Sequence, residues 1–215
     1  MEFNKKELAK LLQTGIDQLK LSIPSLQQEK LLSYLESLNK WNQSYNLTAV
    51  RDPKEMVGKH LLDSLALLPW ITTGDRIIDV GTGAGLPGIP LAICMPEKQF
   101  TLLDSDGKKT RFLTQVVFQL GLSNIKIEQA RVEEYAPEVL WDVILTRAFS
   151  DLQEMLQKTR HLCSNNGLFL AMKGQLPEDE IREMGEEFKI QNIIPLTIPG
   201  SNAERHLIII ARKNQ

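Results

Sequence analysis

Leucine and isoleucine recur at helical spacing through the first seventy residues. The apolar positions are Leu8, Leu11, Leu12, Ile16, Leu19, Leu31, Leu35 and Leu38. This spacing of three and four residues predicts two amphipathic helices, one on each side of Pro24. Asp52 and Pro53 then predict the N-cap and first turn of a further helix, which we expect to continue through residues 60–68. We therefore expect an N-terminal helical extension over residues 1–70.

The pattern changes after residue 70. Short apolar runs alternate with longer amphipathic segments, which is typical of βα units and a parallel sheet. Strands are expected at 76–80, 99–104, 125–128, 141–145, 167–172, 190–198 and 206–211. Helices are expected at 88–95, 107–120, 151–162 and 177–188. Only a short turn with Pro199 and Gly200 separates the last two strands, so they are expected to form an antiparallel hairpin. Residues 71–215 thus read as a doubly wound α/β domain.

A glycine-rich run, DVGTGAGLPG at residues 79–88, follows the first expected strand and leads into a helix. Glycines allow the backbone to turn sharply and let a ligand approach the N–H groups at the helix start. Asp104 ends the next strand, where a carboxylate accepts hydrogen bonds from ribose hydroxyls in folds of this kind. The run therefore predicts a site for a nucleotide-like ligand.

Two cofactor classes fit this run. It contains a GxGxxG pattern, and with Asp104 it is compatible with a nicotinamide-dependent oxidoreductase. However, Asp79 lies two residues before Gly81 and precedes the pattern Gly81-x-Gly83-x-Gly85. This arrangement resembles the first motif of class I methyltransferases, whose acid interacts with the cationic methionine end of the cofactor. A tight turn without a ligand is the remaining alternative.

Further short motifs lie in order along nearly the whole chain. They are WNQSYNLT at 41–48, KHLLDSL at 59–65, LLDS at 102–105, RVE at 131–133, TRA at 146–148, MKG at 172–174 and ERH at 204–206. Together with residues 79–88, they resemble the family of the bacterial ribosomal small-subunit methyltransferase G, also called glucose-inhibited division protein B.

The resemblance implies a seven-stranded, Rossmann-like methyltransferase fold with S-adenosyl-L-methionine as cofactor. It also implies methylation at N7 of a guanine in 16S rRNA, guanine 527 of the 530 loop, with the rRNA or the small ribosomal subunit as partner. Carried over by position, the family's cofactor contacts fall on Gly81, Leu86, Val132, Glu133 and Arg147. The glycine loop and the second strand add Gly83 and Asp104 to the expected cofactor site.

Charged side chains outside the loop supply candidates for catalysis and RNA binding. His60 and Asp63 lie three residues apart on an expected helix, so both are placed to face one pocket as positioning groups or an acid–base pair. A surface histidine with a local hydrogen bond is the alternative. Lys173 and Arg205 lie at strand ends and are expected to contact RNA phosphates. Further cations, on a helix face that is solvated by default, are Lys108, Lys109 and Arg111.

Composition narrows the function classes. The 215 residues are 42% hydrophobic and 24% charged, which suits one sizeable globular core. The net charge of −2 disfavours a polybasic coat, so RNA binding must rest on a local patch. The sequence has no long apolar run and no metal-ligand spacing, and its first residues lack an apolar signal-peptide core, so we expect neither membrane insertion nor export. We expect a cytoplasmic, monomeric enzyme that binds no membrane, with a non-catalytic RNA-binding module as the alternative to an enzyme.

Overall fold

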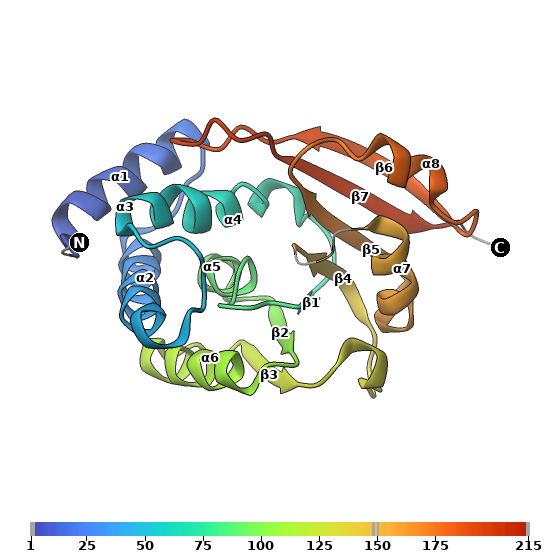
Figure 1. Cartoon of the computed structure of the whole chain (residues 1–215), viewed down its shortest axis with the longest axis horizontal. Coiled ribbons are helices and arrows are strands. Elements are labelled where there is room, and N and C mark those ends of the chain that lie inside the picture. Colours follow the sequence, from blue (N-terminus) through green and yellow to red (C-terminus); the bar gives the residue numbers. More distant parts are fainter. Residues whose placement is uncertain (1–2, 148, 150, 214–215) are drawn as a thin grey trace.

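The computed structural model describes residues 3–147, 149 and 151–213; Ala148 of the TRA motif lies outside them. The strands are β1 (Arg76–Val80), β2 (Gln99–Asp104), β3 (Ile125–Gln129), β4 (Trp141–Thr146), β5 (Cys163–Lys173), β6 (Phe188–Pro195) and β7 (His206–Arg212). They form one sheet in the order β3-β2-β1-β4-β5-β7-β6 (Figure 1). Strands β1 to β5 are parallel, and β7 runs antiparallel to both β5 and β6. The expected fold class and its C-terminal hairpin are confirmed.

The helical segments in the described ranges are α1 (Lys5–Gln18), α2 (Ser25–Tyr45), α3 (Pro53–Met56), the π-helix η1 (Val57–Leu62), α4 (Asp63–Leu65), η2 (Leu68–Trp70), α5 (Gly88–Cys94), α6 (Gly107–Leu120), η3 (Val132–Glu134), α7 (Leu152–Thr159), η4 (Arg160–Leu162) and α8 (Glu178–Glu183). Four of these described segments begin at a side-chain N-cap: α1, α3, α6 and α7. The Asp52 side chain accepts from the Lys54 N–H, and Pro53 opens α3 as expected. Asp106 caps α6 in the same way.

Strands β5 and β6 and helix α8 differ most from the sequence-based expectation. Strand β6 spans Phe188–Pro195, where 190–198 was expected. Strand β5 begins at Cys163, four residues before the expected start, because an irregularity in the β4–β5 pairing between Trp141 and Val143 accommodates the intervening polar residues. Helix α8 is much shorter than the expected 177–188. Phe188 instead begins β6, where its buried ring packs edge-on against Phe169 at 5.7 Å. Tertiary packing overrides local helix propensity there.

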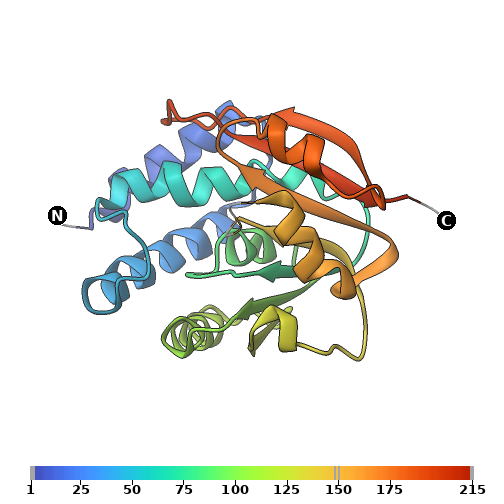
Figure 2. The same cartoon turned by 45° about the vertical axis from the view of Figure 1, so that its right-hand side comes forward.

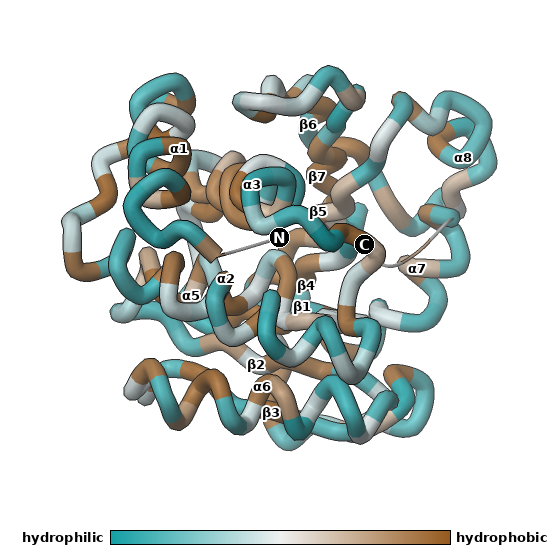
Figure 3. Tube along the Cα trace, turned by 60° about the vertical axis from the view of Figure 1, so that its left-hand side comes forward, coloured by the Kyte–Doolittle hydropathy of each residue, from teal (hydrophilic) through white to brown (hydrophobic). Residues whose placement is uncertain are grey.

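Helices cover both faces of the sheet. The N-terminal helices, α5 and α6 gather on one face, and α7 lies on the other (Figures 1 and 2). Hydrophobic residues concentrate along the strands and the inward turns of the helices (Figure 3). None of the helices in the described ranges is long and apolar enough to cross a membrane.

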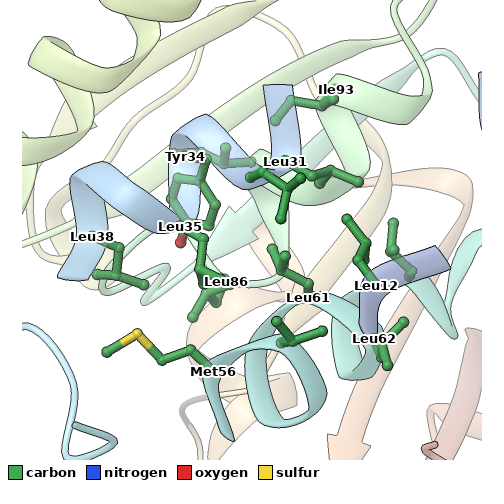
Figure 4. Packing of buried hydrophobic residues seen from close by; sticks show 14 of the residues in the cluster. Leu12, Leu31, Tyr34, Leu35, Leu38, Met56, Leu61, Leu62, Leu86 and Ile93 are labelled. Carbon is green, nitrogen blue, oxygen red and sulfur yellow. The ribbon is translucent and has the colours of Figure 1, made fainter. Parts of the chain in front are cut away.

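The N-terminal helices pack directly behind the glycine loop. Leu31 and Leu35 of α2 lie in one buried cluster with Leu86 of the loop (Figure 4). The Tyr34 hydroxyl, also buried, donates to the Ala84 carbonyl at 2.8 Å. Ile198, in the loop between β6 and β7, enters the same cluster. This cluster therefore ties the first seventy residues both to the glycine loop and to the C-terminal hairpin.

Candidate active site

The glycine loop leaves β1 and folds back over the carboxyl end of β2. The N–H groups of Gly81 and Thr82 donate to the Leu103 carbonyl, which fixes the loop beside β2. Gly83 has φ +62° with no atom closer than 4.0 Å to an added Cβ, so glycine is needed for conformation. Gly85 has φ +90°, and a Cβ there would lie 2.5 Å from Ile89. Backbone geometry thus explains the glycine pattern.

Asp79 braces this loop from beneath. Its side chain is buried, and Oδ2 accepts hydrogen bonds from the Thr82 hydroxyl at 2.7 Å and the Gly88 N–H at 2.8 Å. Burial raises the pKa of this carboxyl to about 6. Oδ1 is buried without a hydrogen-bond partner among the described residues. Asp79 therefore fixes Gly88, the first residue of α5, through a hydrogen bond. The sequence predicted a ligand near the start of this helix.

Asp104 lines a cavity of about 260 Å³. Its carboxylate accepts from the Gly83 N–H at 2.8 Å and the Asp106 N–H at 2.9 Å, and Lys109 lies 3.5 Å away. The walls are Val80, Gly81, Leu103, Asp104, Ser105, Lys109, Ala130, Arg131, Val132, Glu133 and Phe149. An acceptor at one strand end, open glycine backbone and the apolar Val132 suit a nucleoside.

Glu133 lies at the outer wall of this cavity. Lys158 makes an ion pair with its carboxylate at 2.9 Å, and this hydrogen bond lowers the pKa of Glu133. The side chain is 46% exposed, so its electrostatic contribution to stability is small. The structure brings the sequence-predicted residues Gly81, Asp104, Val132 and Glu133 together around this one cavity.

A second cavity, of about 200 Å³, shares Gly81 with the first. It is lined by Leu47, Thr48, Gly81, Thr82, Gly83, Ala84, Leu86 and Arg147. The segment after α2 forms one wall because buried Asn42 holds it: its amide donates to the Val50 carbonyl and accepts from the Thr48 N–H. This explains the WNQSYNLT motif, although sequence reasoning assigned no site role to Leu47 or Thr48.

His60 and Asp63 do not pair with each other; each has its own partners. His60 is buried, and its Nε2 lies 2.9 Å from the Thr48 hydroxyl. Burial lowers the pKa of His60 to about 4. The Asp63 carboxylate contacts Arg147 Nη1 at 3.2 Å through Oδ2 and Arg205 Nε at 2.8 Å through Oδ1. The acid–base pair that the spacing suggested is therefore replaced by two separate interactions.

Lys173 is less accessible than its position at the end of β5 predicts. Its ammonium lies 2.6 Å from Glu180, and its side chain is only 10% exposed. Glu180 also accepts from the Leu152 N–H at the start of α7. Arg205, 31% exposed, is the more open of the two predicted RNA contacts. Of the cations after Asp104, Lys109 lines the nucleoside-sized cavity.

The described ranges contain no group of three or more His, Cys, Asp or Glu side chains arranged to hold a metal ion. The polar groups around the two cavities include glycine backbone, carboxylates, Lys109 and arginines.

The chain is similar to known proteins over most of its length. A family model described as rRNA small subunit methyltransferase G matches residues 27–208. The chain belongs to this family. The resemblance inferred from the motifs is thereby confirmed.

Relatives with the same name match this chain over nearly their full length. The chain is 51% identical over 208 residues to the ribosomal RNA small subunit methyltransferase G of Alteromonas mediterranea, covering 97% of this chain and 98% of the relative. It is 50% identical over 198 residues to the Pseudomonas aeruginosa protein of the same name, covering 92% of each.

Solved structures at low identity share the fold. One is a SAM-dependent methyltransferase from Thiobacillus denitrificans in complex with S-adenosyl-L-homocysteine, with TM-score 0.56, 11% identity and coverage of 82% and 98% of the two chains. Another is TrmN from Thermus thermophilus, with TM-score 0.53, 18% identity and coverage of 70% and 48%.

Proposed function

We propose that this protein transfers a methyl group from S-adenosyl-L-methionine to N7 of a guanine in 16S rRNA, guanine 527 of the 530 loop. Family membership over residues 27–208 supports the reaction class and the rRNA substrate. The observation that carries the cofactor assignment is the position of Asp104: it accepts from the Gly83 N–H of the glycine loop and lines one cavity together with Gly81. We further propose that the protein works as a monomer in the cytoplasm, where ribosomal RNA is found.

The residues around the two cavities fit this cofactor. Asp104 would accept hydrogen bonds from the ribose, while Val132 and Glu133 border the space for the adenine. Gly81, Gly83, Leu86 and Arg147 surround the adjoining cavity, where the methionine end would lie. When bound, S-adenosylmethionine supplies an electrophilic methyl group on a sulfonium.

The chemistry of the acceptor atom determines what the protein must do. Guanine N7 has an in-plane lone pair and carries no proton, so no general base is needed to create the nucleophile. The protein's task is to hold the base in line with the methyl group, and positioning of this kind lowers a barrier by several kcal/mol. His60 suits this scheme because its lowered pKa keeps it neutral while it holds Thr48 at the cavity wall.

RNA would approach the same edge of the sheet. Arg205 lies in the turn before β7 and is placed to contact a phosphate. Lys173, at the neighbouring strand end, would add a second contact by exchanging its Glu180 partner for a phosphate. A local patch of this kind is consistent with a chain whose net charge is −2.

Methyl transfer from tritiated S-adenosylmethionine tests the proposal directly. Naked 16S rRNA, an assembly intermediate and the complete small subunit are compared as substrates. Reduction followed by aniline cleaves RNA at 7-methylguanosine, and primer extension then locates the modified base. Label in RNA without aniline-sensitive cleavage would contradict N7. Binding of NAD in preference to S-adenosylmethionine, followed by fluorescence quenching, would contradict the cofactor, and RNA binding without transfer would indicate a binding module.

A further inference from the structure

One buried carboxylate joins two arginines from distant parts of the chain. Asp63 lies 84 residues before Arg147 and 142 residues before Arg205, yet contacts both guanidinium groups. We propose that Asp63 is a positioning residue that holds these arginines as a preassembled pair at the edge of the second cavity. Arg147 borders the space for the methionine end of the cofactor, and Arg205 beside it receives an RNA phosphate. The identity of the ligand rests on the proposed function.

The geometry favours an anion at the arginines. Each arginine contacts a different oxygen of Asp63, at 3.2 Å for Arg147 and 2.8 Å for Arg205. The Asp63 side chain is 2% exposed, whereas the arginine side chains are 30% and 31% exposed. An approaching phosphate therefore meets guanidinium groups while the carboxylate stays covered. The carboxylate also offsets the repulsion between the two cations and leaves the trio with a net charge of +1, which still attracts a phosphate.

The backbone around Asp63 is built to keep this arrangement. Asp63 directly follows the π-helix η1, an uncommon element that is frequent at functional sites. Gly58 of that helix lies under the β6–β7 loop, where an added Cβ would be 3.4 Å from the Pro199 carbonyl oxygen. Ile198 of the same loop is buried among the N-terminal helices. The loop is thus anchored at an apolar point and at Arg205, which reduces the ordering that RNA binding requires.

A second carboxylate–arginine pair supplies a matched control. Asp142 lies 3.4 Å from Arg76 at the start of β4, whereas Arg147 lies just past the end of that strand. Asp142 also accepts from the N–H groups of Asp75 and Arg76, so it serves the amino edge of the sheet. Substituting Asp142→Asn removes a comparable charge far from the two cavities of the site.

The test compares Asp63→Asn with Asp142→Asn. Binding is measured with a 16S rRNA fragment that contains the 530 loop. Asp63→Asn also raises the net charge of the trio from +1 to +2, which by itself favours RNA. We still expect the Kd to rise about tenfold, because two rotamer-rich side chains must then be ordered on binding and this cost outweighs the added attraction. Asp142→Asn should leave the Kd at the parental value. In nitrogen-15 NMR spectra, the Arg205 Nε–H signal, assigned by its loss in Arg205→Lys, should move in Asp63→Asn and stay in Asp142→Asn.

A double variant separates positioning from a general loss of packing. Asp63→Asn should add little to the loss in an Arg205→Ala background, since the two residues act as a unit. Additive losses, or a folded Asp63→Asn protein with parental Kd and NMR signal, would overturn the proposal. If Asp63→Asn does not fold, Arg205→Lys decides, because it keeps the charge but loses Nε–H. Parental RNA affinity in Arg205→Lys would overturn the proposal.

These readouts do not depend on methyl transfer. A parent protein that binds the RNA but transfers no methyl group would refute the proposed function, while the Asp63 variants would still be judged on affinity and NMR. A parent protein that methylates the RNA, with an Asp63→Asn variant of parental affinity, would refute only the role of Asp63.

Discussion

The two halves of the candidate site are built in different ways. The nucleoside-sized cavity is formed at the carboxyl ends of β1, β2 and β3, with Phe149 after β4, and its main polar contacts are backbone groups and the carboxylate of Asp104. The arginine pair instead depends on Asp63, Arg147 and Arg205, which lie in the N-terminal helices, after β4 and before β7. The first half is assembled from successive strand ends within residues 80–149. The second joins residues up to 142 positions apart, including one from the N-terminal helices. The helical extension contributes to both halves, behind the loop through Tyr34 and beside the arginines through Asp63.

The largest expected effect concerns the packing behind the loop. Leu86→Ala should lower the free energy of unfolding by about 2–5 kcal/mol, because it leaves a cavity between α2 and the glycine loop. Denaturant unfolding measures the change. Leu26→Ala is the control. Leu26 lies on α2, the helix that packs behind the loop, but is 62% exposed, so its loss should change stability little. If Leu86→Ala were as stable as Leu26→Ala, the packing of the N-terminal helices against the glycine loop would contribute little to the free energy of unfolding.

Asp104, on the cavity side of the glycine loop, should affect ligand binding more than stability. Asp104→Ala should weaken S-adenosylmethionine binding by roughly 1.5–3 kcal/mol, the usual range for hydrogen bonds to a charged group. Titration calorimetry gives the affinity. Asp106→Asn keeps the cap of α6 two residues further on and should bind the cofactor normally. Unchanged affinity in Asp104→Ala would remove this carboxylate from the cofactor site.

The Tyr34 hydroxyl tests the contact on the buried side of the glycine loop. Tyr34→Phe leaves the Ala84 carbonyl without its donor in a buried position, at an expected cost of about 1–3 kcal/mol in stability. Thermal unfolding measures the loss. Tyr45→Phe removes a hydroxyl from the last residue of the same helix, where the side chain is 46% exposed, and should have little effect. Equal stability of the two variants would mean that the loop does not depend on Tyr34.

Arg205 and Lys173 should affect how strongly the RNA affinity depends on salt. Neutralising Arg205 should reduce the slope of log affinity against log salt by about one unit, the effect of one phosphate contact. Lys173→Gln should reduce it less, because the Lys173 side chain is only 10% exposed and pairs with Glu180, whereas the Arg205 side chain is 31% exposed. Filter binding at several salt concentrations gives both slopes. Parental slopes in both variants would place the RNA contacts elsewhere, with Lys109 next in order.

The contrast between the two halves also explains what could be predicted from sequence. The strands, the glycine loop and Asp104 follow from local patterns, because apolar periodicity and missing Cβ atoms act within a few residues. The partners of Asp63 could not be inferred, since nothing near residue 63 encodes a contact 142 residues away. The site role of Thr48 was missed for a related reason: Asn42 folds that segment back through side-chain hydrogen bonds.

The smallest expected effect is on the pH dependence of the reaction. Between pH 6.5 and 9 the single-turnover rate should change by less than about twofold, since attack by guanine N7 releases no proton. Burial lowers the pKa of His60 to about 4, so His60 is neutral throughout this range. Burial raises the pKa of Asp79 to about 6, so Asp79 is ionised over nearly all of it. Rapid-quench measurements across the range give the profile.

Proton-linked changes in stability should not distort this profile. The pKa of His60 is lower in the folded protein than the usual 6.5, so its contribution to stability is lost only as the pH falls below about 6.5. The pKa of Asp79 is raised from 3.8 to about 6, so its protonation favours the folded state at low pH. This contribution to stability is lost as the pH rises through about 6. Both windows lie below the tested range. A tenfold rise in rate per pH unit that His60→Ala abolishes would therefore indicate an essential base, and would count equally against N7 as the acceptor.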